Sequence, residues 1–95
     1  MLTQEEKSLV RNIVYSVLKA SEHQAFIFGS QATGMAQRSS DLDIGIEGPE
    51  LPLEVIGELR EKLEDSDLPY TVDIIDFSTV NQQFKNVAKN TIITL

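Results

Sequence analysis

Apolar residues recur at helical spacing in three segments of this chain. The first segment, residues 3–19, begins with TQEE, which has the form of a helix-capping box. The second, residues 52–64, begins at a proline, a residue that suits the first position of a helix. The third, residues 80–90, follows a second capping pattern, TVNQ. The apolar positions that predict these three helices are Leu9, Val10, Ile13, Val14, Val17 and Leu18; Leu53, Ile56, Leu59 and Leu63; and Val80, Phe84 and Val87.

Three shorter apolar segments lie between these helices and predict β-strands. Residues 25–28 form a continuous apolar run that ends at a glycine, which is typical of a buried strand. Residues 42–46 alternate between apolar and polar positions, and residues 71–77 form a third strand with two differently composed faces. Residues 30–37, between the first two strands, are expected to form one or two helical turns.

This order of elements predicts a single α/β domain over residues 1–95, with a three-stranded mixed sheet flanked by helices. The connection between the second and third strands carries a helix, so these strands are expected to be parallel. The shorter link between the first two strands permits an antiparallel pair. The last five residues are apolar enough to form a terminal turn or a tail that faces a partner.

The composition is that of a small globular domain. The chain has 95 residues, of which 41% are hydrophobic, so disorder is not expected. A domain of this size has modest stability, and a partner chain or an oligomer would add to it. Cysteine is absent, which excludes disulfides and thiolate metal sites. No signal-peptide pattern and no long apolar run is present, so we expect a cytoplasmic protein without a membrane segment.

The charge balance argues against one class of substrate. Eight basic and fifteen acidic residues give a formal net charge of −7. A long nucleic acid is a poor ligand for such a chain, because binding to its phosphates needs a basic surface. A small nucleotide complexed with Mg²⁺ remains compatible, since the ion neutralises the phosphates locally. The negative charge also suits a basic protein partner.

Two aspartates in the second predicted strand, Asp41 and Asp43, occupy alternate positions and therefore share one face. Because the two carboxylates repel each other, both stay ionised only with a cation between them. Mg²⁺ prefers such oxygen ligands and completes its shell with water and substrate phosphates. Upstream, Gly29-Ser30 offers backbone amides and a hydroxyl to an anion. A phosphate site beside a divalent-metal site is typical of nucleotidyl transfer, whereas an isolated pair of this kind also occurs on solvated edge strands.

A third metal-binding carboxylate is expected on the last predicted strand. Asp73 and Asp76 lie on its opposite faces, so only one of them can reach the other two aspartates. Asp73 lies in mid-strand with no lysine or arginine near it in the sequence, and a metal ion would compensate its charge. Asp76 lies at the strand end, where a solvated or capping role is sufficient. We therefore predict Asp41, Asp43 and Asp73 as the catalytic and metal-binding set.

The expected nucleotide-binding residues are Gly29, Ser30 and Arg38. Arg38 is the only lysine or arginine within positions 20–59, which favours a contact with phosphate; the alternative is that it is a solvated loop residue. Gln31 either donates to a phosphate or a base, or lies on the surface.

The pattern GSQATGMAQRSSDLDIGI, followed by VDIIDF, resembles the minimal nucleotidyltransferases (MNT domains) of the DNA polymerase β superfamily. The resemblance covers essentially the whole chain and implies a small nucleotidyltransferase fold. It implies that Asp41 and Asp43 bind Mg²⁺, that Asp73 is the third acid, and that Gly29-Ser30 holds the nucleoside triphosphate.

The same resemblance implies an antitoxin that transfers AMP from ATP to a tyrosine of a HEPN-domain ribonuclease. Family members often carry basic residues where this chain has Gln31 and Thr33, so Arg38 is the nearest cation to the triphosphate. Two alternatives follow. The domain neutralises a HEPN protein by binding alone, or it is the nucleotide-binding subunit of a two-chain transferase that acts on a small hydroxyl compound. The sequence leaves the acceptor, the nucleobase and the oligomeric state open.

Overall fold

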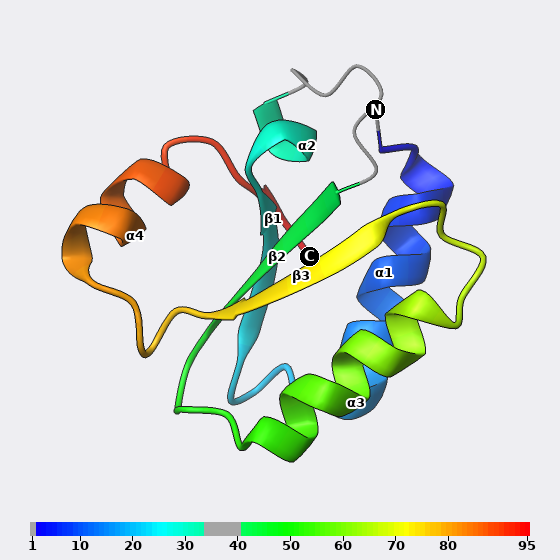
Figure 1. Ribbon diagram of the computed structural model, residues 1–95, viewed down its shortest axis with the longest axis horizontal. Helices are drawn as coiled ribbons and strands as arrows, with labels where there is room; N and C mark the ends of the chain where they lie inside the picture. Colours follow the sequence, from blue (N-terminus) through cyan, green and yellow to red (C-terminus); the bar gives the residue numbers. More distant parts are fainter. Residues whose placement is uncertain (1, 34–40) are drawn as a thin grey trace.

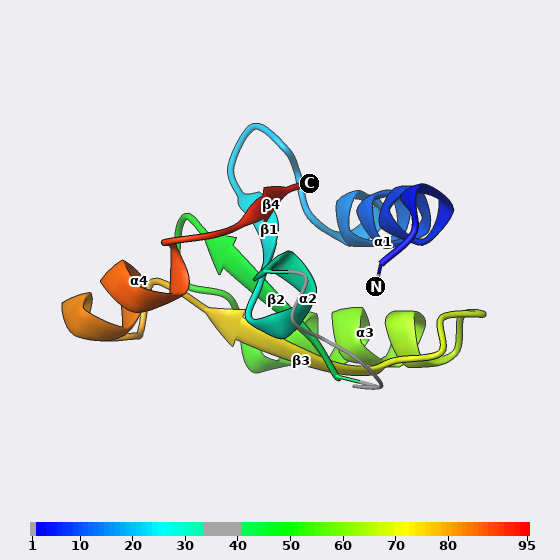
Figure 2. The ribbon, with the colours of Figure 1, turned by 90° about the horizontal axis from the view of Figure 1, so that it is seen from above.

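The computed structural model, which describes residues 2–33 and 41–95, has a sheet with helices on both faces (Figure 1). In Figure 2, α1 and α3 lie on one side of the sheet and α4 on the other. The elements follow the predicted order and add one strand at the end. Their bounds are α1 Gln4–Val17, β1 Gln24–Phe28, α2 Ser30–Thr33, β2 Asp41–Glu47, α3 Leu53–Glu64, β3 Thr71–Asp76, α4 Gln82–Ala88 and β4 Ile93–Thr94.

The sheet has four strands in the order β3-β2-β1-β4, so the expectation of three strands was wrong. The strands β2 and β3 are parallel, as predicted, and β1 is antiparallel to β2. The additional strand, β4, pairs with β1 through Ile93 and Thr94. The carbonyl of Leu95 accepts hydrogen bonds from the hydroxyl of Tyr15 and the side-chain amide of Gln24. These hydrogen bonds hold the final residues at the edge of the sheet.

The main hydrophobic core lies between the sheet and the pair α1 and α3. It combines buried residues of these helices, such as Val14 and Leu59, with Leu42, Ile44 and Ile46 of β2. The predicted capping box of α1 is confirmed. The backbone amide of Thr3 donates to the carboxylate of Glu6, and the backbone amide of Glu6 donates to the hydroxyl of Thr3.

The start of α3 differs from the prediction. Pro52 is the N-cap residue, with extended backbone, rather than the first residue of the helix. Leu53 is 82% exposed and does not belong to the core stripe. The start of α4 is also shifted, because Asn81 caps it by accepting a hydrogen bond from the amide of Phe84. Of the helices in residues 2–33 and 41–95, none has the length and apolar character needed to cross a membrane.

A second, smaller core lies on the opposite face of the sheet, under α4. Its buried residues are Phe26, Phe28 and Phe77, whose rings contact one another at tilted or edge-to-face angles, and the partly exposed ring of Phe84 contacts Phe28 and Phe77. The rings of Phe26 and Phe77 fill the space above Gly45 of β2, where an added Cβ atom would collide with both. Glycine at this position therefore allows aromatic residues to cover one end of this face.

Asp76, at the end of β3, has a structural role. Its carboxylate accepts hydrogen bonds from the amides of Leu51 (2.8 Å) and Ser78 (2.9 Å), and its side chain is buried. The solvated role expected as one alternative is therefore wrong, and the carboxylate binds the backbone of two loops rather than capping α4, whose N-cap is Asn81. Burial raises the pKa of Asp76, but the hydrogen bonds from Leu51 and Ser78 outweigh burial and hold the pKa below its ordinary value.

Replacing Asp76 by asparagine is expected to lower the free energy of unfolding by about 1.5–3 kcal/mol at pH 7, the range for hydrogen bonds to a charged group. Because the pKa is lower in the folded protein, this stabilisation is complete above the ordinary value of 3.8 and disappears as the pH falls through the folded value. Urea unfolding of both proteins at pH 7 and in acid measures the difference. Equal midpoints at pH 7 would contradict the assignment.

Candidate active site

The three predicted aspartates lie on the same face of the sheet as α4, at the end that this helix leaves uncovered. Asp43 of β2 is the register partner of Asp73 on β3, and Asp41 is paired with Thr71. Because the residues between them, such as Leu42, point into the main core, Asp41, Asp43 and Asp73 share the opposite face. An open pocket of about 460 Å³ is lined by these carboxylates together with Arg60, Glu64, Thr71 and Val72.

Asp43 is the central carboxylate of this group. Burial, the negative charge of Asp73 and that of Asp41 together raise the pKa of Asp43 above its ordinary value. The ionised site therefore holds unfavourable negative charge that a cation would relieve. Within residues 2–33 and 41–95, no three acidic or histidine side chains are arranged so as to hold a metal ion as they stand.

The turn at Gly29-Ser30 lies directly beside Asp43. Gly29 has a positive φ of 74°, and a Cβ atom on it would collide with Oδ2 of Asp43. Glycine is therefore required twice, for the backbone conformation and for the close approach of the carboxylate. The turn leads into α2, where the amides of Ala32 and Thr33 donate to the carbonyl of Gly29. The predicted proximity of this turn to the aspartates is thus present in the structure.

The surface position expected as one alternative for Gln31 is wrong, and its side chain has a positioning role that the sequence did not indicate. It is buried, with 2% exposure, and its side-chain amide donates to the carbonyl of Asp41 at 3.2 Å. This hydrogen bond connects α2 to the start of β2 and so fixes the Gly29-Ser30 turn relative to the first carboxylate. A polar residue immediately after the turn was the available signal, but its partner is distant in the sequence and could not be inferred.

Arg60 of α3 is the second residue that the sequence did not assign to the site. Its Nη2 lies 3.9 Å from Oδ1 of Asp73, and both side chains are partly exposed. The sequence places no basic residue near Asp73, but β3 is an edge strand and α3 packs beside it, so the arginine reaches it through the fold. The predicted phosphate contact Arg38 lies outside the described residues.

A comparison with protein families decides what kind of domain this is. A model of the family described as "Polymerase beta, Nucleotidyltransferase" matches residues 13–94, nearly the whole chain. The chain belongs to the polymerase β nucleotidyltransferase family. Members of this family are enzymes that generally use divalent metal ions.

Individual relatives agree with this assignment. The chain is 30% identical over 93 residues to a Haemophilus influenzae protein named "Probable protein adenylyltransferase MntA", covering 96% of this chain and 79% of the relative. It also resembles a crystal structure of a toxin–antitoxin with AMP-PNP, with a TM-score of 0.74 at 22% identity, over 97% of this chain and 72% of the other.

A third similarity is to a complex of MNT antitoxin with tri-AMPylated Shewanella oneidensis HEPN toxin, with a TM-score of 0.64 at 22% identity. It covers 93% of this chain and 70% of the other. The two solved structures confirm the expected nucleotidyltransferase fold, with its mixed sheet flanked by helices.

Proposed function

We propose that this protein is a Mg²⁺-dependent nucleotidyltransferase that transfers AMP from ATP to a HEPN-domain toxin, and that it is the antitoxin of that pair. The observation that carries the proposal is the placement of Asp43 between Asp41 and Asp73, directly over Gly29, in a member of the nucleotidyltransferase family. The relative named as a protein adenylyltransferase and the complex with an AMPylated HEPN toxin support the acceptor and the transferred group. A cytoplasmic setting, expected from the sequence, suits ATP as donor.

The reaction uses a hydroxyl group of the toxin as nucleophile. Its oxygen attacks the α-phosphorus of ATP and forms a new P–O bond, while the bond between this phosphorus and the oxygen bridging to the β-phosphate breaks. Pyrophosphate leaves with the electron pair of that bond. The hydroxyl proton passes to the carboxylate of Asp73, which is exposed at the edge strand and so accessible to a second protein.

Asp41, Asp43 and Asp73 are the residues that would hold the divalent metal ion. Three carboxylates provide the oxygen donors that Mg²⁺ prefers, and the raised pKa of Asp43, caused by burial and its two neighbours, marks an excess of negative charge. When bound, such an ion neutralises charge on the phosphates and activates the attacking hydroxyl. Gly29 and Ser30 hold the triphosphate, and Arg38 is the cation proposed to contact it.

Arg60 competes with a metal ion for Asp73 in this scheme, because both are cations beside the same carboxylate. Replacing Arg60 by methionine is expected to strengthen Mg²⁺ or Mn²⁺ binding by about 1.5- to 5-fold, the equivalent of one exposed ion pair. Titration of the metal-free protein at low ionic strength measures this. Unchanged or weaker metal binding would show that Arg60 does not compete with the ion.

Incubation with α-labelled ATP, Mg²⁺ and the cognate HEPN protein tests the proposed function. The wild-type protein should label the toxin, and the Asp41→Asn/Asp43→Asn variant should not. The matched control is Asp65→Asn/Asp67→Asn, which removes two charges at the same spacing from exposed positions after α3. Equal labelling by the wild type and the Asp41/Asp43 variant would overturn the mechanism.

A toxicity assay separates catalysis from neutralisation by binding alone. Cells that express the toxin should be rescued by the wild-type protein and by the Asp65/Asp67 control. If the Asp41→Asn/Asp43→Asn variant rescued them equally well, the domain would act as a binding antitoxin.

A further inference from the structure

Four residues form a row across the sheet at the active site. Gly29 follows β1 and lies beside the carboxylate of Asp43 on β2. Asp43 is the register partner of Asp73 on β3, and Nη2 of Arg60 on α3 lies 3.9 Å from Oδ1 of Asp73. Because the strand order is β3-β2-β1-β4, Gly29 and Arg60 lie at opposite ends of this row.

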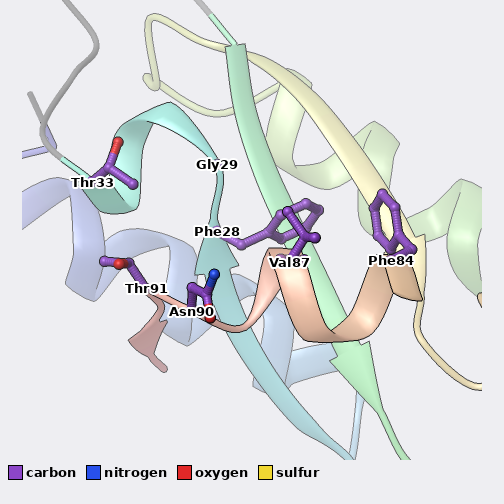
Figure 3. Close-up of a pocket in the computed structure, with 8 residues that line it drawn as sticks. Phe28, Gly29, Thr33, Phe84, Val87, Asn90 and Thr91 are labelled. Atoms are coloured by element: carbon purple, nitrogen blue, oxygen red, sulfur yellow. The ribbon is translucent and has the colours of Figure 1, made fainter. Parts of the chain in front are cut away.

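The two ends of the row differ in their access to a second protein. At the Gly29 end, Figure 3 shows α2 and the segment from α4 to Thr91 close to the end of β1, and the hollow between them has a volume of about 400 Å³, the size of a small-molecule site. At the other end, β3 is the edge strand, and Arg60 and Asp73 have side chains that are 46% and 60% exposed. A protein therefore reaches the carboxylates most directly from the Arg60 end.

The direction of the proposed reaction requires the acceptor at this same end. In an in-line displacement, the attacking and leaving oxygens lie on opposite sides of the phosphorus. The proposed function places the triphosphate at Gly29 and Ser30, so pyrophosphate leaves at their end of the row. The hydroxyl group of the toxin then arrives from the Arg60 end, beside Asp73, the carboxylate proposed to accept its proton.

The mouth of the acidic pocket at this end carries charges of both signs. Arg60 and Glu64 are four residues apart on α3, a spacing that places their Cβ atoms about 5–6 Å apart on one side of the helix. Both are exposed and both line the pocket. Of the described residues in its lining, only Val72 is apolar, whereas small-molecule sites are lined mainly by apolar side chains. The mouth therefore suits a charged protein surface better than a small hydroxyl compound.

Arg60 can exchange its partner at this mouth. Helix α3 lies on the face of the sheet opposite the aspartates, so the side chain of Arg60 reaches Asp73 around the edge of β3. An ion pair between two half-exposed side chains is weak, and the guanidinium can leave Asp73 for another carboxylate at little cost. Its planar fork binds a carboxylate at two points, which lysine cannot reproduce. Glu64, one turn further along α3, suits a lysine or an arginine.

We propose that Arg60 and Glu64 recognise the acceptor protein by binding an acidic and a basic side chain next to its reactive hydroxyl group. This inference rests on the proposed function and assigns the choice of acceptor to α3 rather than to the three aspartates. Opposite charges in a fixed order set the register of two proteins and select against partners with the wrong charges.

Rates of AMP transfer from α-labelled ATP at saturating Mg²⁺, measured against the concentration of the HEPN protein and separately against that of ATP, test the proposal. The variants are Arg60→Met, Glu64→Gln and their combination. The control is Glu58→Gln/Lys62→Met, which removes an exposed pair of opposite charges at the same spacing from α3.

We expect each single variant to raise the KM for the HEPN protein by about 1.5- to 5-fold, the equivalent of one exposed ion pair, and the combination to raise it further. Binding of the HEPN protein without ATP, measured by surface plasmon resonance, should weaken by the same factor. Arg60→Lys should lie between the wild type and Arg60→Met, because it keeps the charge and loses the fork. The KM for ATP, and both KM values of the control, should stay within about twofold of the wild type, as for surface substitutions away from a contact.

Other results would overturn the inference in distinguishable ways. If the wild type transferred AMP and the combined variant kept its KM for the HEPN protein, α3 would not contact the acceptor, and the proposed function would stand. An equal rise in the KM for ATP would place Arg60 and Glu64 at the donor instead. An equal effect of the control would show that only the overall charge of α3 matters. A wild type that bound the HEPN protein without transferring AMP would refute the proposed function and this inference with it.

Discussion

The Asp43→Asn variant is expected to lose nucleotidyl transfer on the order of a thousandfold while becoming more stable. Asp43 lies between the other two carboxylates and over Gly29, so no other residue can replace it. A group that holds a catalytic metal ion accounts for several kcal/mol of transition-state stabilisation, which corresponds to this loss. Labelling of the HEPN protein with α-labelled ATP measures the rate.

The gain in stability follows from the raised pKa of Asp43, which burial and the charges of Asp73 and Asp41 cause. The folded protein binds this proton more tightly than the unfolded chain, so the ionised aspartate lowers stability as the pH rises above its ordinary value of 3.8. Cross-strand pairs contribute about 0.2–1 kcal/mol, and each kcal/mol shifts the melting temperature of such a domain by about 4–8 °C.

Metal-free Asp43→Asn should therefore melt a few degrees above the wild type at pH 7, and the difference should vanish in acid. The Asp76→Asn variant provides the opposite case, because that carboxylate accepts two backbone hydrogen bonds and its loss is destabilising. Added Mg²⁺ should raise the melting temperature of the wild type and leave Asp43→Asn unchanged. A metal-free Asp43→Asn that melted below the wild type would refute this account.

The Gly29→Ala variant is expected to lose about 1–3 kcal/mol of stability and to transfer AMP about a hundredfold more slowly. Gly29 has a φ of 74°, a conformation that strains residues with a Cβ atom, and the added methyl group collides with the carboxylate of Asp43. Either the turn or the carboxylate must shift, and a displacement of about 1 Å at a reacting centre has this effect on rate. Denaturant unfolding and the labelling assay measure the two effects.

The matched control is Gly57→Ala in α3. A Cβ atom at Gly57 meets nothing within 4 Å, and alanine favours a helix over glycine. This variant should gain about 0.5–1 kcal/mol of stability and keep the wild-type rate. If Gly29→Ala retained full activity, the close contact between the turn and Asp43 would not matter for the reaction.

The sequence predicted the elements that carry the carboxylates. The pattern of residues 42–46 and 71–77 predicted the faces of both strands correctly, and the helix in the connection between them correctly predicted that they are parallel. From these two facts alone, Asp41, Asp43 and Asp73 are expected on one face. Local periodicity was sufficient to place the three aspartates on one face, because two adjacent strands carry all of them.

Features that depend on distant partners were not predictable. The strand β4 has only two residues and exists because Ile93 and Thr94 pair with β1. The hydrogen bond from Gln31 to the backbone of Asp41 and the ion pair between Arg60 and Asp73 likewise join segments whose proximity only the fold determines. The prediction of Leu53 as a core residue was wrong because this residue occurs at core spacing but lies in the first turn of α3, beyond the edge of the core.

The aromatic packing over Gly45 has a consequence for how this fold can diversify. Helix α4 has seven residues, and its Phe84 joins the phenylalanine cluster that includes the rings above that glycine. Apart from Ala88, which also packs against this cluster, the other residues of α4 are therefore open to substitution without a change in the strands that bear the aspartates. The outer surface of this short helix and the strands that carry the carboxylates are then separate in their packing, and selection can alter the first while preserving the second.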